Sequence, residues 1–121
     1  MKIRRGDILY VELGASRSGS IQSGIRPVVV VSNNKANKFS TIFTVVPLST
    51  RIFKKTHLPT HVFVSAYTSA GLNQHSIALC EQVTAISYEK VIENLGHVDN
   101  STLDQITEAV KVQIGAYDEY N

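Results

Sequence analysis

The sequence predicts a mainly β domain, a small β-barrel against which one C-terminal helix packs. Short runs of β-branched and aromatic residues, separated by turn-forming residues, fill the first two thirds of the chain. The last segment instead places apolar residues at intervals of three and four, from Leu103 to Tyr117, which is the period of an amphipathic helix. Many short strands followed by one such helix favour a small barrel. The 121 residues contain no linker or repeat, so we expect a single domain over 1–121.

Strands are expected where apolar runs are bounded by Gly, Pro, Ser or Asn. They cover residues 6–13, 28–31, 43–48, 61–64 and 76–80, and the last continues through 83–86. Pro27 is expected to open the second strand, because a strand tolerates proline at its first residue. A helical turn capped by Ser87 is predicted over 87–94. The C-terminal helix is predicted over 100–117, with Asn100 or Ser101 as its cap.

Three connections between these elements are polar. The Gly- and Ser-rich segment 14–24 is long for so small a domain, which is typical of a functional flap. Residues 33–38 are predicted to form a polar turn, and residues 51–59 a basic loop.

The net charge of +2 conceals an asymmetry along the chain. Residues 1–60 contain ten Lys or Arg against two acids, a balance of +8, and residues 61–121 contain two against eight, a balance of −6. This distribution favours a basic face that attracts a polyanion, although charges distant in sequence can also mix in space.

Several classes of protein are disfavoured by composition. No apolar run approaches the roughly 20 residues that cross a membrane, and the first ten residues lack the apolar core of a signal peptide. Cys80 is the only cysteine, which excludes an internal disulfide and fits a reducing compartment, so we expect a cytoplasmic protein. No Cys or His spacing suits zinc, and no metal or other cofactor is expected.

Five segments carry a family resemblance. They are GDILYVELG at 6–14, GIRPVVVVSNN at 24–34, VVPLST at 45–50, LPTHV at 58–62 and SIALCEQVTAIS at 76–87. In this order, over nearly the whole chain, they resemble MazF/PemK toxins of type II toxin-antitoxin systems. The resemblance implies a Src-homology-3-like barrel of the MazF/PemK/CcdB type with a C-terminal helix, acting as a homodimer. It also implies a sequence-specific endoribonuclease (an mRNA interferase) that cleaves single-stranded RNA and is inhibited by a cognate MazE/PemI-like antitoxin.

The resemblance gives the catalytic roles to Arg26 and to a hydroxyl residue. A guanidinium is planar, always charged and able to form paired bonds to phosphate, which suits it to stabilise a phosphorane. Counting forward from Pro47 selects Ser49 as the hydroxyl residue, whereas counting back from Leu58 favours Thr50. Successive strand residues face opposite sides, so only one of the two is expected to face the phosphate. Without a metal, we expect products with 2′,3′-cyclic phosphate and 5′-hydroxyl ends.

Further RNA contacts are expected from polar and basic residues of the connections and of the CEQ segment. They are Arg17, Gln22, Ser23, Asn37, Lys38, Lys54, Glu81 and Gln82. Gln22 lies where many relatives carry an acid, so this segment is not expected to supply a carboxylate base. Glu81 and Gln82 either orient Arg26, read a base or only close a strand pair. His57 and His61 are expected to be structural or to contact RNA.

Two other functions compete with RNA cleavage. A CcdB-like poison of DNA gyrase would share the fold without nuclease activity, but the C-terminal segment 115–121 lacks the aromatic-plus-Gly ending expected for it. A peptide-binding adaptor barrel would gather its aromatics, whereas the five Tyr and four Phe are scattered along this chain.

Overall fold

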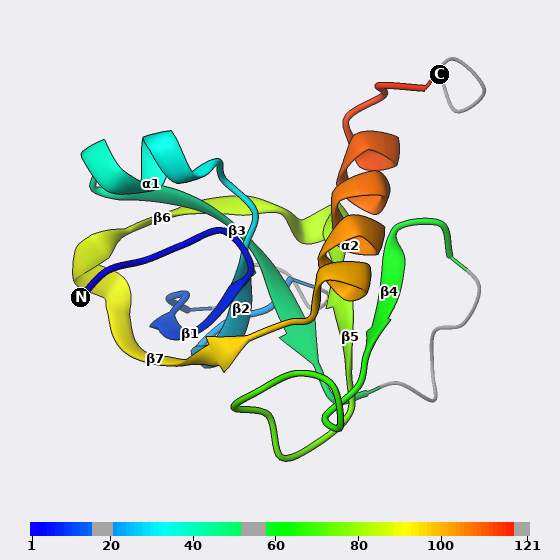
Figure 1. The fold of residues 1–121 in the computed structure, drawn as a ribbon, viewed down its shortest axis with the longest axis horizontal. Helices are drawn as coiled ribbons and strands as arrows, with labels where there is room; N and C mark the ends of the chain where they lie inside the picture. The colour runs from blue at the N-terminus through cyan, green and yellow to red at the C-terminus, as the bar shows by residue number, and fades with distance from the viewer. Residues whose placement is uncertain (16–20, 52–57, 118–121) are drawn as a thin grey trace.

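The computed structural model describes residues 1–15, 21–51 and 58–117 (Figure 1). Their strands and helices follow one another along the chain as β1 (Asp7–Glu12), β2 (Ile25–Val30), α1 (Asn34–Phe39), β3 (Ile42–Ser49), β4 (His61–Val64), β5 (Ser76–Leu79), η1 (Cys80–Gln82), β6 (Thr84–Ser87), η2 (Tyr88–Lys90), β7 (Val91–His97) and α2 (Asn100–Gln113), where η marks a short 3-10 helix.

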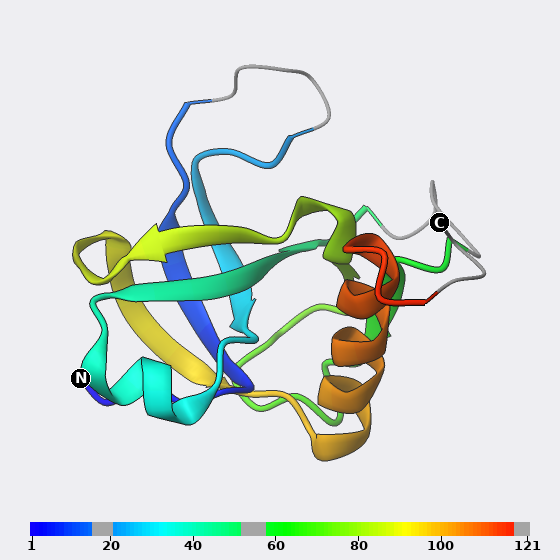
Figure 2. The same ribbon diagram turned by 90° about the horizontal axis from the view of Figure 1, so that it is seen from above.

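The strands form one seven-stranded sheet in the order β4-β5-β3-β2-β1-β7, with β6 paired to β3 beside this path. All the pairings are antiparallel, and the sheet curls strongly (Figure 2). No ladder joins β4 to β7 within the described residues, so the barrel is open. The prediction of a mainly β, barrel-like domain with a C-terminal helix is confirmed.

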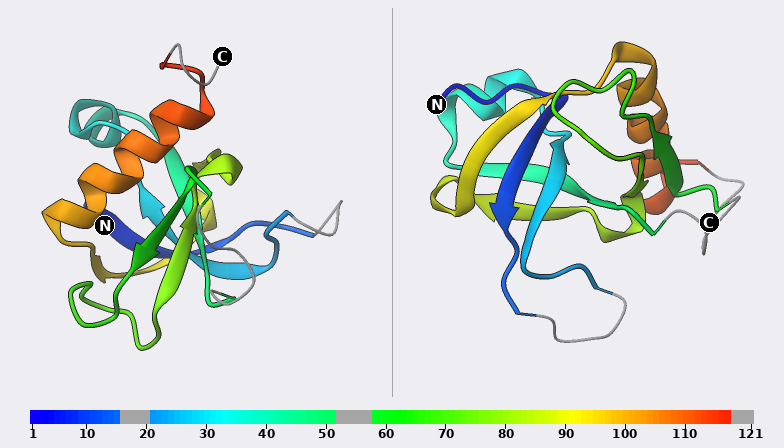
Figure 3. Two further views of the ribbon diagram at one scale, coloured as in Figure 1. Left: turned by 90° about the vertical axis from the view of Figure 1, so that its right-hand side faces the viewer. Right: turned by 90° about the horizontal axis from the view of Figure 1, so that it is seen from below.

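The curled sheet has a core on each face. On one face, Val29, Val46 and Leu48 pack with strands β4 and β5 and with Ile106 and Ala109 of α2. Figure 3 shows α2 lying along this side of the molecule. On the other face, the sheet folds over its own side chains. These are Ile3, Leu9, Val11, Val28, Val30, Phe43, Val45 and Ile86.

Most predicted strands are confirmed, but β2 begins earlier than expected. It starts at Ile25, so Arg26 and Pro27 lie inside it, opposite Val11 and Tyr10 of β1. The ladder between β2 and β3 begins only at Val28. Pro27, which has no backbone N–H, therefore lies outside this ladder and leaves none of its hydrogen bonds unmade.

The polar turn predicted over 33–38 is instead the short helix α1. The Asn33 side chain accepts a hydrogen bond from the Ala36 amide at 2.8 Å and caps the helix. Asn-rich sequence suits both a turn and a helix N-terminus, and here the cap decides for the helix.

The predicted strand over 76–86 is divided by η1. Its two parts, β5 and β6, both pair with β3, β5 near the end of β3 and β6 near its beginning. The break places Glu81 and Gln82 on a bend beside β3, where a continuous strand would have kept them in a ladder.

Only the first part of the helical turn predicted over 87–94 is correct. Tyr88–Lys90 is a 3-10 turn, and Ser87 makes no side-chain capping bond. Residues 91–97 form β7, whose pairing with β1 contains two register shifts. These irregularities break the alternation that identifies a strand in sequence.

The C-terminal helix begins at Asn100 as predicted, but its cap lies one residue earlier and the helix ends earlier than predicted. Asp99, rather than Asn100 or Ser101, is the N-cap residue, and its carboxylate accepts a hydrogen bond from the Thr102 hydroxyl. Gly115, with a φ of 75°, ends the helix, so Tyr117 lies beyond it. No described helix is long and apolar enough to cross a membrane.

Candidate functional site

Arg26 lies in β2, close to where the strand leaves residues 21–24. Its Nε donates a hydrogen bond to the Ser23 carbonyl oxygen at 3.0 Å, which ties the side chain back onto the preceding connection. The residue is half-buried, and it forms no ion pair with any acid of the described residues. Among the described residues, no carboxylate neutralises this guanidinium, which leaves its charge available to an anion.

Ser49 is the last residue of the neighbouring strand β3. The ladder between β2 and β3 begins at the pair Val28 and Pro47, with Arg26 two residues before Val28 and Ser49 two residues after Pro47. Both share the sheet face of Val28 and Val45, because side chains repeat every second residue. The Ser49 side chain is buried, and its Oγ accepts a hydrogen bond from the Arg51 amide at 3.2 Å.

Thr50 points to the opposite face. It is exposed, and with Pro27 and Leu72 it lines a cavity of about 180 Å³. Leu72 packs against the core cluster between the sheet and α2. The cavity that Leu72 shares with Thr50 therefore lies on the α2 side of the sheet, which faces away from Ser49. The alternation expected for the hydroxyl pair is present, and it places Ser49 rather than Thr50 on the face of Arg26.

Three of the predicted RNA-contacting residues meet in one cavity of about 300 Å³. Gln22, Glu81 and Gln82 line it together with Pro47 of β3. The backbone N–H of Gln22 donates a hydrogen bond to Gln82 Oε1 at 2.8 Å. Gln22 Oε1 is itself buried and has no hydrogen-bond partner in the described part of the chain, so it remains able to accept a hydrogen bond from a ligand.

Glu81 is engaged away from Arg26. Its Oε2 lies 2.8 Å from Nε2 of His61, and its Oε1 accepts a hydrogen bond from the Thr60 hydroxyl at 3.2 Å. The His61 side chain is only 4% exposed, so this pair fixes the bend at η1 to the beginning of β4. None of the hydrogen bonds of Glu81 within the described residues reaches Arg26, and its contacts with His61 and Thr60 favour a structural role.

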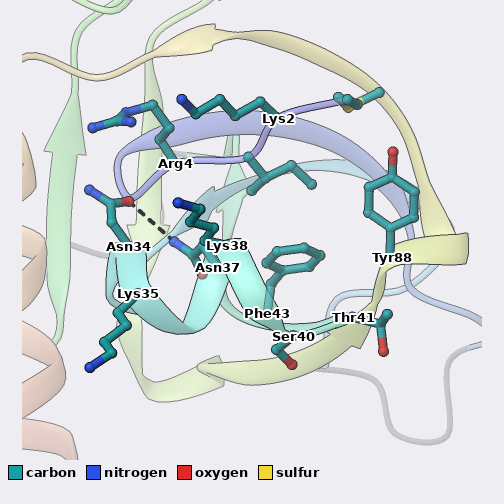
Figure 4. A pocket seen from close by; sticks show the side chains of 12 residues that line it. Lys2, Arg4, Asn34, Lys35, Asn37, Lys38, Ser40, Thr41, Phe43 and Tyr88 are labelled. Atoms are coloured by element: carbon teal, nitrogen blue, oxygen red, sulfur yellow. Dashed lines mark hydrogen bonds between the residues drawn. The ribbon is translucent and has the colours of Figure 1, made fainter.

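Asn37 and Lys38 lie at the other end of the barrel. They border a cavity of about 750 Å³ between α1, the N-terminal residues and η2 (Figure 4). Asn37 is buried, and its side chain bonds to the Ser32 hydroxyl and carbonyl, which commits its amide to holding α1. Lys38 is exposed and lies above the Phe39 ring. In Figure 2, α1 lies next to the end of β2 and the beginning of β1, away from the end of the barrel where β2 begins.

The remaining predicted contacts fall outside the described residues. These are Arg17 and Lys54, together with His57 from the same basic connection as Lys54. No group of three or more His, Cys, Asp or Glu that could hold a metal occurs in residues 1–15, 21–51 and 58–117.

Sequence reasoning missed the residues beyond the end of β3. A cavity of about 370 Å³ there is lined by Thr50, Tyr67, Asn73, Gln74 and His75. Residues 65–75 offered no strand or helix pattern, and only the fold brings them next to Thr50. The exposed aromatic and amide side chains in this connection were the available signal.

A curled, open antiparallel sheet with a C-terminal helix, and with an arginine and a hydroxyl on one face of two adjacent strands, defines a small barrel of the toxin type. Residues 4–114 match the family model of the PemK-like, MazF-like toxins of type II toxin-antitoxin systems. The chain therefore belongs to the PemK/MazF toxin family.

The similarity to known proteins extends over almost the whole chain. It is 32% identical over 118 residues to the endoribonuclease EndoA of Bacillus subtilis strain 168, covering 98% of this chain and 99% of that one. It is 30% identical to the endoribonuclease MazF of Staphylococcus saprophyticus, over 95% and 93% of the two chains. In fold it is similar to MazF from Deinococcus radiodurans, with a TM-score of 0.78, 16% identity, and coverage of 95% and 98%. It is also similar to a mycobacterial endoribonuclease solved with its cognate antitoxin, with a TM-score of 0.75, 23% identity, and coverage of 95% and 97%.

Proposed function

We propose that this protein is an endoribonuclease toxin that cleaves single-stranded mRNA at a short sequence motif, without a metal ion. The observation that carries the proposal is that Arg26 of β2 and Ser49 of the adjacent strand β3 lie on the same face of the sheet. Membership of the family and similarity to two named endoribonucleases support it. The same relatives disfavour a gyrase poison. Because the proposed substrate is mRNA, the cytoplasm is the proposed place of action.

Cleavage begins with attack of the ribose 2′-oxygen on the adjacent phosphorus. A new P–O2′ bond forms, the P–O5′ bond breaks, one proton leaves the 2′-hydroxyl and one reaches the departing 5′-oxygen. The phosphorane between these events carries additional negative charge on its non-bridging oxygens. The Arg26 guanidinium suits the stabilisation of that charge, and this kind of contact is commonly the largest single contribution to catalysis.

Ser49 is the proposed hydroxyl partner. Its Oγ already accepts the Arg51 amide hydrogen, which orients the oxygen and leaves the hydroxyl hydrogen to donate to a phosphate oxygen. Arg26 and Ser49 would then approach the same phosphate from adjacent strands. Thr50, on the opposite face, would contact a neighbouring part of the RNA instead of the reacting phosphate.

Base recognition is proposed for the cavity next to this pair. The carboxamides of Gln22 and Gln82 offer both donors and acceptors, and the buried Oε1 of Gln22 suits an amino group on a base edge. Ser23 contributes through its carbonyl oxygen, which holds Arg26. Lys38, together with Arg17 and Lys54, is proposed to contact phosphates outside this core.

The protein is proposed to act as a homodimer under the control of an antitoxin. One small open barrel presents a rim rather than an enclosed groove, so two copies related by a two-fold axis are the simplest way to form a groove for RNA. An acidic, partly disordered MazE/PemI-like segment would occupy the places of RNA phosphates and order as it binds. Light scattering at micromolar concentration should give about twice the 13.3 kDa chain mass.

The chemistry is tested by the ends that cleavage produces. The purified protein is incubated with a long RNA of defined sequence in excess EDTA, and both ends of each fragment are determined. We expect cuts at one recurring motif, with 2′,3′-cyclic phosphate and 5′-hydroxyl ends. Fragments with 5′-phosphate ends, or cleavage that requires a divalent ion, would contradict the proposed mechanism.

A further inference from the structure

An exposed group of aromatic rings, here called the aromatic platform, lies beyond β4. It consists of Phe63, Tyr67 and His75. The His75 ring lies 5.3 Å from the Phe63 ring and 5.0 Å from the Tyr67 ring, between centroids. Phe63 is 50% exposed and Tyr67 is 91% exposed. Large aromatic side chains are usually buried, so two exposed rings that both pack on the partly buried His75 ring require an explanation.

The register of the sheet connects the platform to the proposed catalytic pair. Ser49 of β3 is paired with Ile77 of β5, and Ile77 is paired with Phe63 of β4. Residues paired in this way point to the same face, so Phe63 shares the face of Ser49 and Arg26. Neighbouring strands lie about 4.8 Å apart, which puts the Phe63 backbone roughly 10 Å from that of Ser49. A short stretch of single-stranded RNA spans this separation.

The platform is also held firmly in place. Residues 65–75 turn beneath the end of β3 (Figure 1) and reach β7, where the Ala70 amide donates to the His97 carbonyl at 3.0 Å. Gly71 and Gly96 allow the two backbones to touch, since a Cβ on Gly71 would lie 1.9 Å from the Leu95 carbonyl oxygen. His75 Nδ1 accepts the Ala66 amide hydrogen at 3.0 Å, which fixes the central ring.

Polar groups that suit a base edge adjoin the exposed ring of Tyr67. The 370 Å³ cavity beside it is lined by Asn73 and Gln74, which are both exposed, and by Thr50. Gln74 and Thr50 also line the smaller cavity next to Pro27, so these hollows lie at the end of β3 on the side of Thr50, whereas Phe63 lies on the side of Ser49. An aromatic face for stacking and an amide for the edge are the two elements by which proteins hold an unpaired base.

We propose that the aromatic platform is a subsite that stacks an unpaired base of the RNA strand flanking the cleaved bond. This inference rests on the proposed function and adds a binding determinant to it. Phe63 and Tyr67 provide the stacking surface, and Asn73 and Gln74 contact the edge of the same base. The platform contributes to RNA binding and takes no part in the chemical step.

The test compares a Phe63→Leu/Tyr67→Leu double variant with Phe39→Leu, a matched control at an exposed ring on α1. The probe is an RNA that carries the mapped cleavage motif with a 2′-deoxy nucleotide at the cut, and each flanking position is replaced in turn by an abasic nucleotide. Affinity is measured by fluorescence anisotropy, and cleavage constants are measured on the all-ribose RNA. Thermal unfolding checks that each variant is folded.

For the wild type, we expect one flanking position where loss of the base weakens binding about tenfold, as base–aromatic stacking typically does. The double variant should bind the intact RNA about tenfold more weakly, be insensitive to the abasic change at that position, and show a higher KM with kcat unchanged. Phe39→Leu should behave as the wild type.

Unchanged RNA binding by the double variant, or an equal loss in Phe39→Leu, would overturn the platform while leaving the proposed function intact. Unchanged RNA binding with weakened binding of the antitoxin would assign the surface to a protein partner instead. A wild type that neither binds nor cleaves any RNA would overturn the proposed function, and the platform with it.

Discussion

Nε2 of His61 lies 2.8 Å from Oε2 of Glu81, and the pair joins the beginning of β4 to the bend that separates β5 from β6. The Thr60 hydroxyl donates to the second carboxylate oxygen. The Glu81 carboxylate, which the sequence suggested as a partner of Arg26, thus stabilises the bend that contains Gln82.

Loss of this carboxylate should destabilise the fold. In Glu81→Ala, the mostly buried His61 ring loses its partner, and we expect the free energy of unfolding to fall by about 1–2 kcal/mol. Urea denaturation measures the change, with Glu89→Ala as the control because Glu89 is an exposed acid on η2. Equal stability of the two variants would show that the pair contributes nothing.

The hydroxyl assignment separates Ser49 from Thr50. Because only Ser49 shares the face of Arg26, Ser49→Ala should lower the cleavage rate roughly 100-fold, as the loss of one transition-state donor does. Thr50→Ala should change it only a few-fold, and Ser49→Thr should restore activity because it restores a hydroxyl. If Thr50→Ala were the more damaging change, Thr50 would be the catalytic hydroxyl instead.

Gly71 and Gly14 form a matched pair for testing the contact between residues 65–75 and β7. Both have a positive φ, of 96° and 89°, but a Cβ would meet the Leu95 carbonyl oxygen at Gly71 and nothing within 4 Å at Gly14. The backbone strain on substitution is therefore shared, and only Gly71→Ala adds a clash. We expect the Tm of Gly71→Ala to lie at least about 5 °C below that of Gly14→Ala. Equal Tm values would show that the close approach does not contribute to stability.

Cys80 should be chemically silent in the folded protein. Burial, with a further contribution from the charge of Glu81, raises the pKa of the Cys80 thiol from 9.0 to about 12. Since the thiolate is the nucleophile, iodoacetamide at pH 8 should modify Cys80 in urea and not in the native state. Modification at equal rates in both states would contradict this burial.

The same pKa difference predicts a decline in stability at alkaline pH. The unfolded chain loses the Cys80 proton above about pH 9, whereas the folded protein keeps it until about pH 12. The contribution is therefore complete below pH 9 and is lost as the pH rises from there. In Cys80→Ala, the free energy of unfolding should fall less steeply between these values. Parallel curves for the two proteins would exclude Cys80 as a source of the decline.

The strands were predictable where a run of valines or a clear alternation marks burial, as in β2, β3 and β4. The pattern failed at β7, an edge strand with two register shifts, and at α1, where an asparagine cap converts a turn into a helix. The β7 outcome depends on its pairing with β1, whereas at α1 an Asn-rich segment suits both a turn and a helix and the local sequence leaves the choice open.

The candidate site was predictable as a set of residue types but not as an arrangement. Arg26, Ser49 and the Gln22–Gln82 pair were expected to act, and the structure brings Gln22 and Gln82 into hydrogen-bond contact. The choice between Ser49 and Thr50 required the register of β2 and β3. The burial of Asn37 and the position of Tyr67 depend on how distant segments pack, which no local pattern gives.

The central claim, that Arg26 stabilises the phosphorane of a metal-independent RNA cleavage, is tested most directly by Arg26→Ala. Initial cleavage rates on one defined RNA in EDTA are compared among the wild type, Arg26→Ala and Arg4→Ala, the last being an exposed arginine beside the cavity at the other end of the barrel. We predict a loss of roughly 100-fold or more for Arg26→Ala, with an unchanged Tm, and near wild-type cleavage for Arg4→Ala. Wild-type cleavage by folded Arg26→Ala would contradict the account.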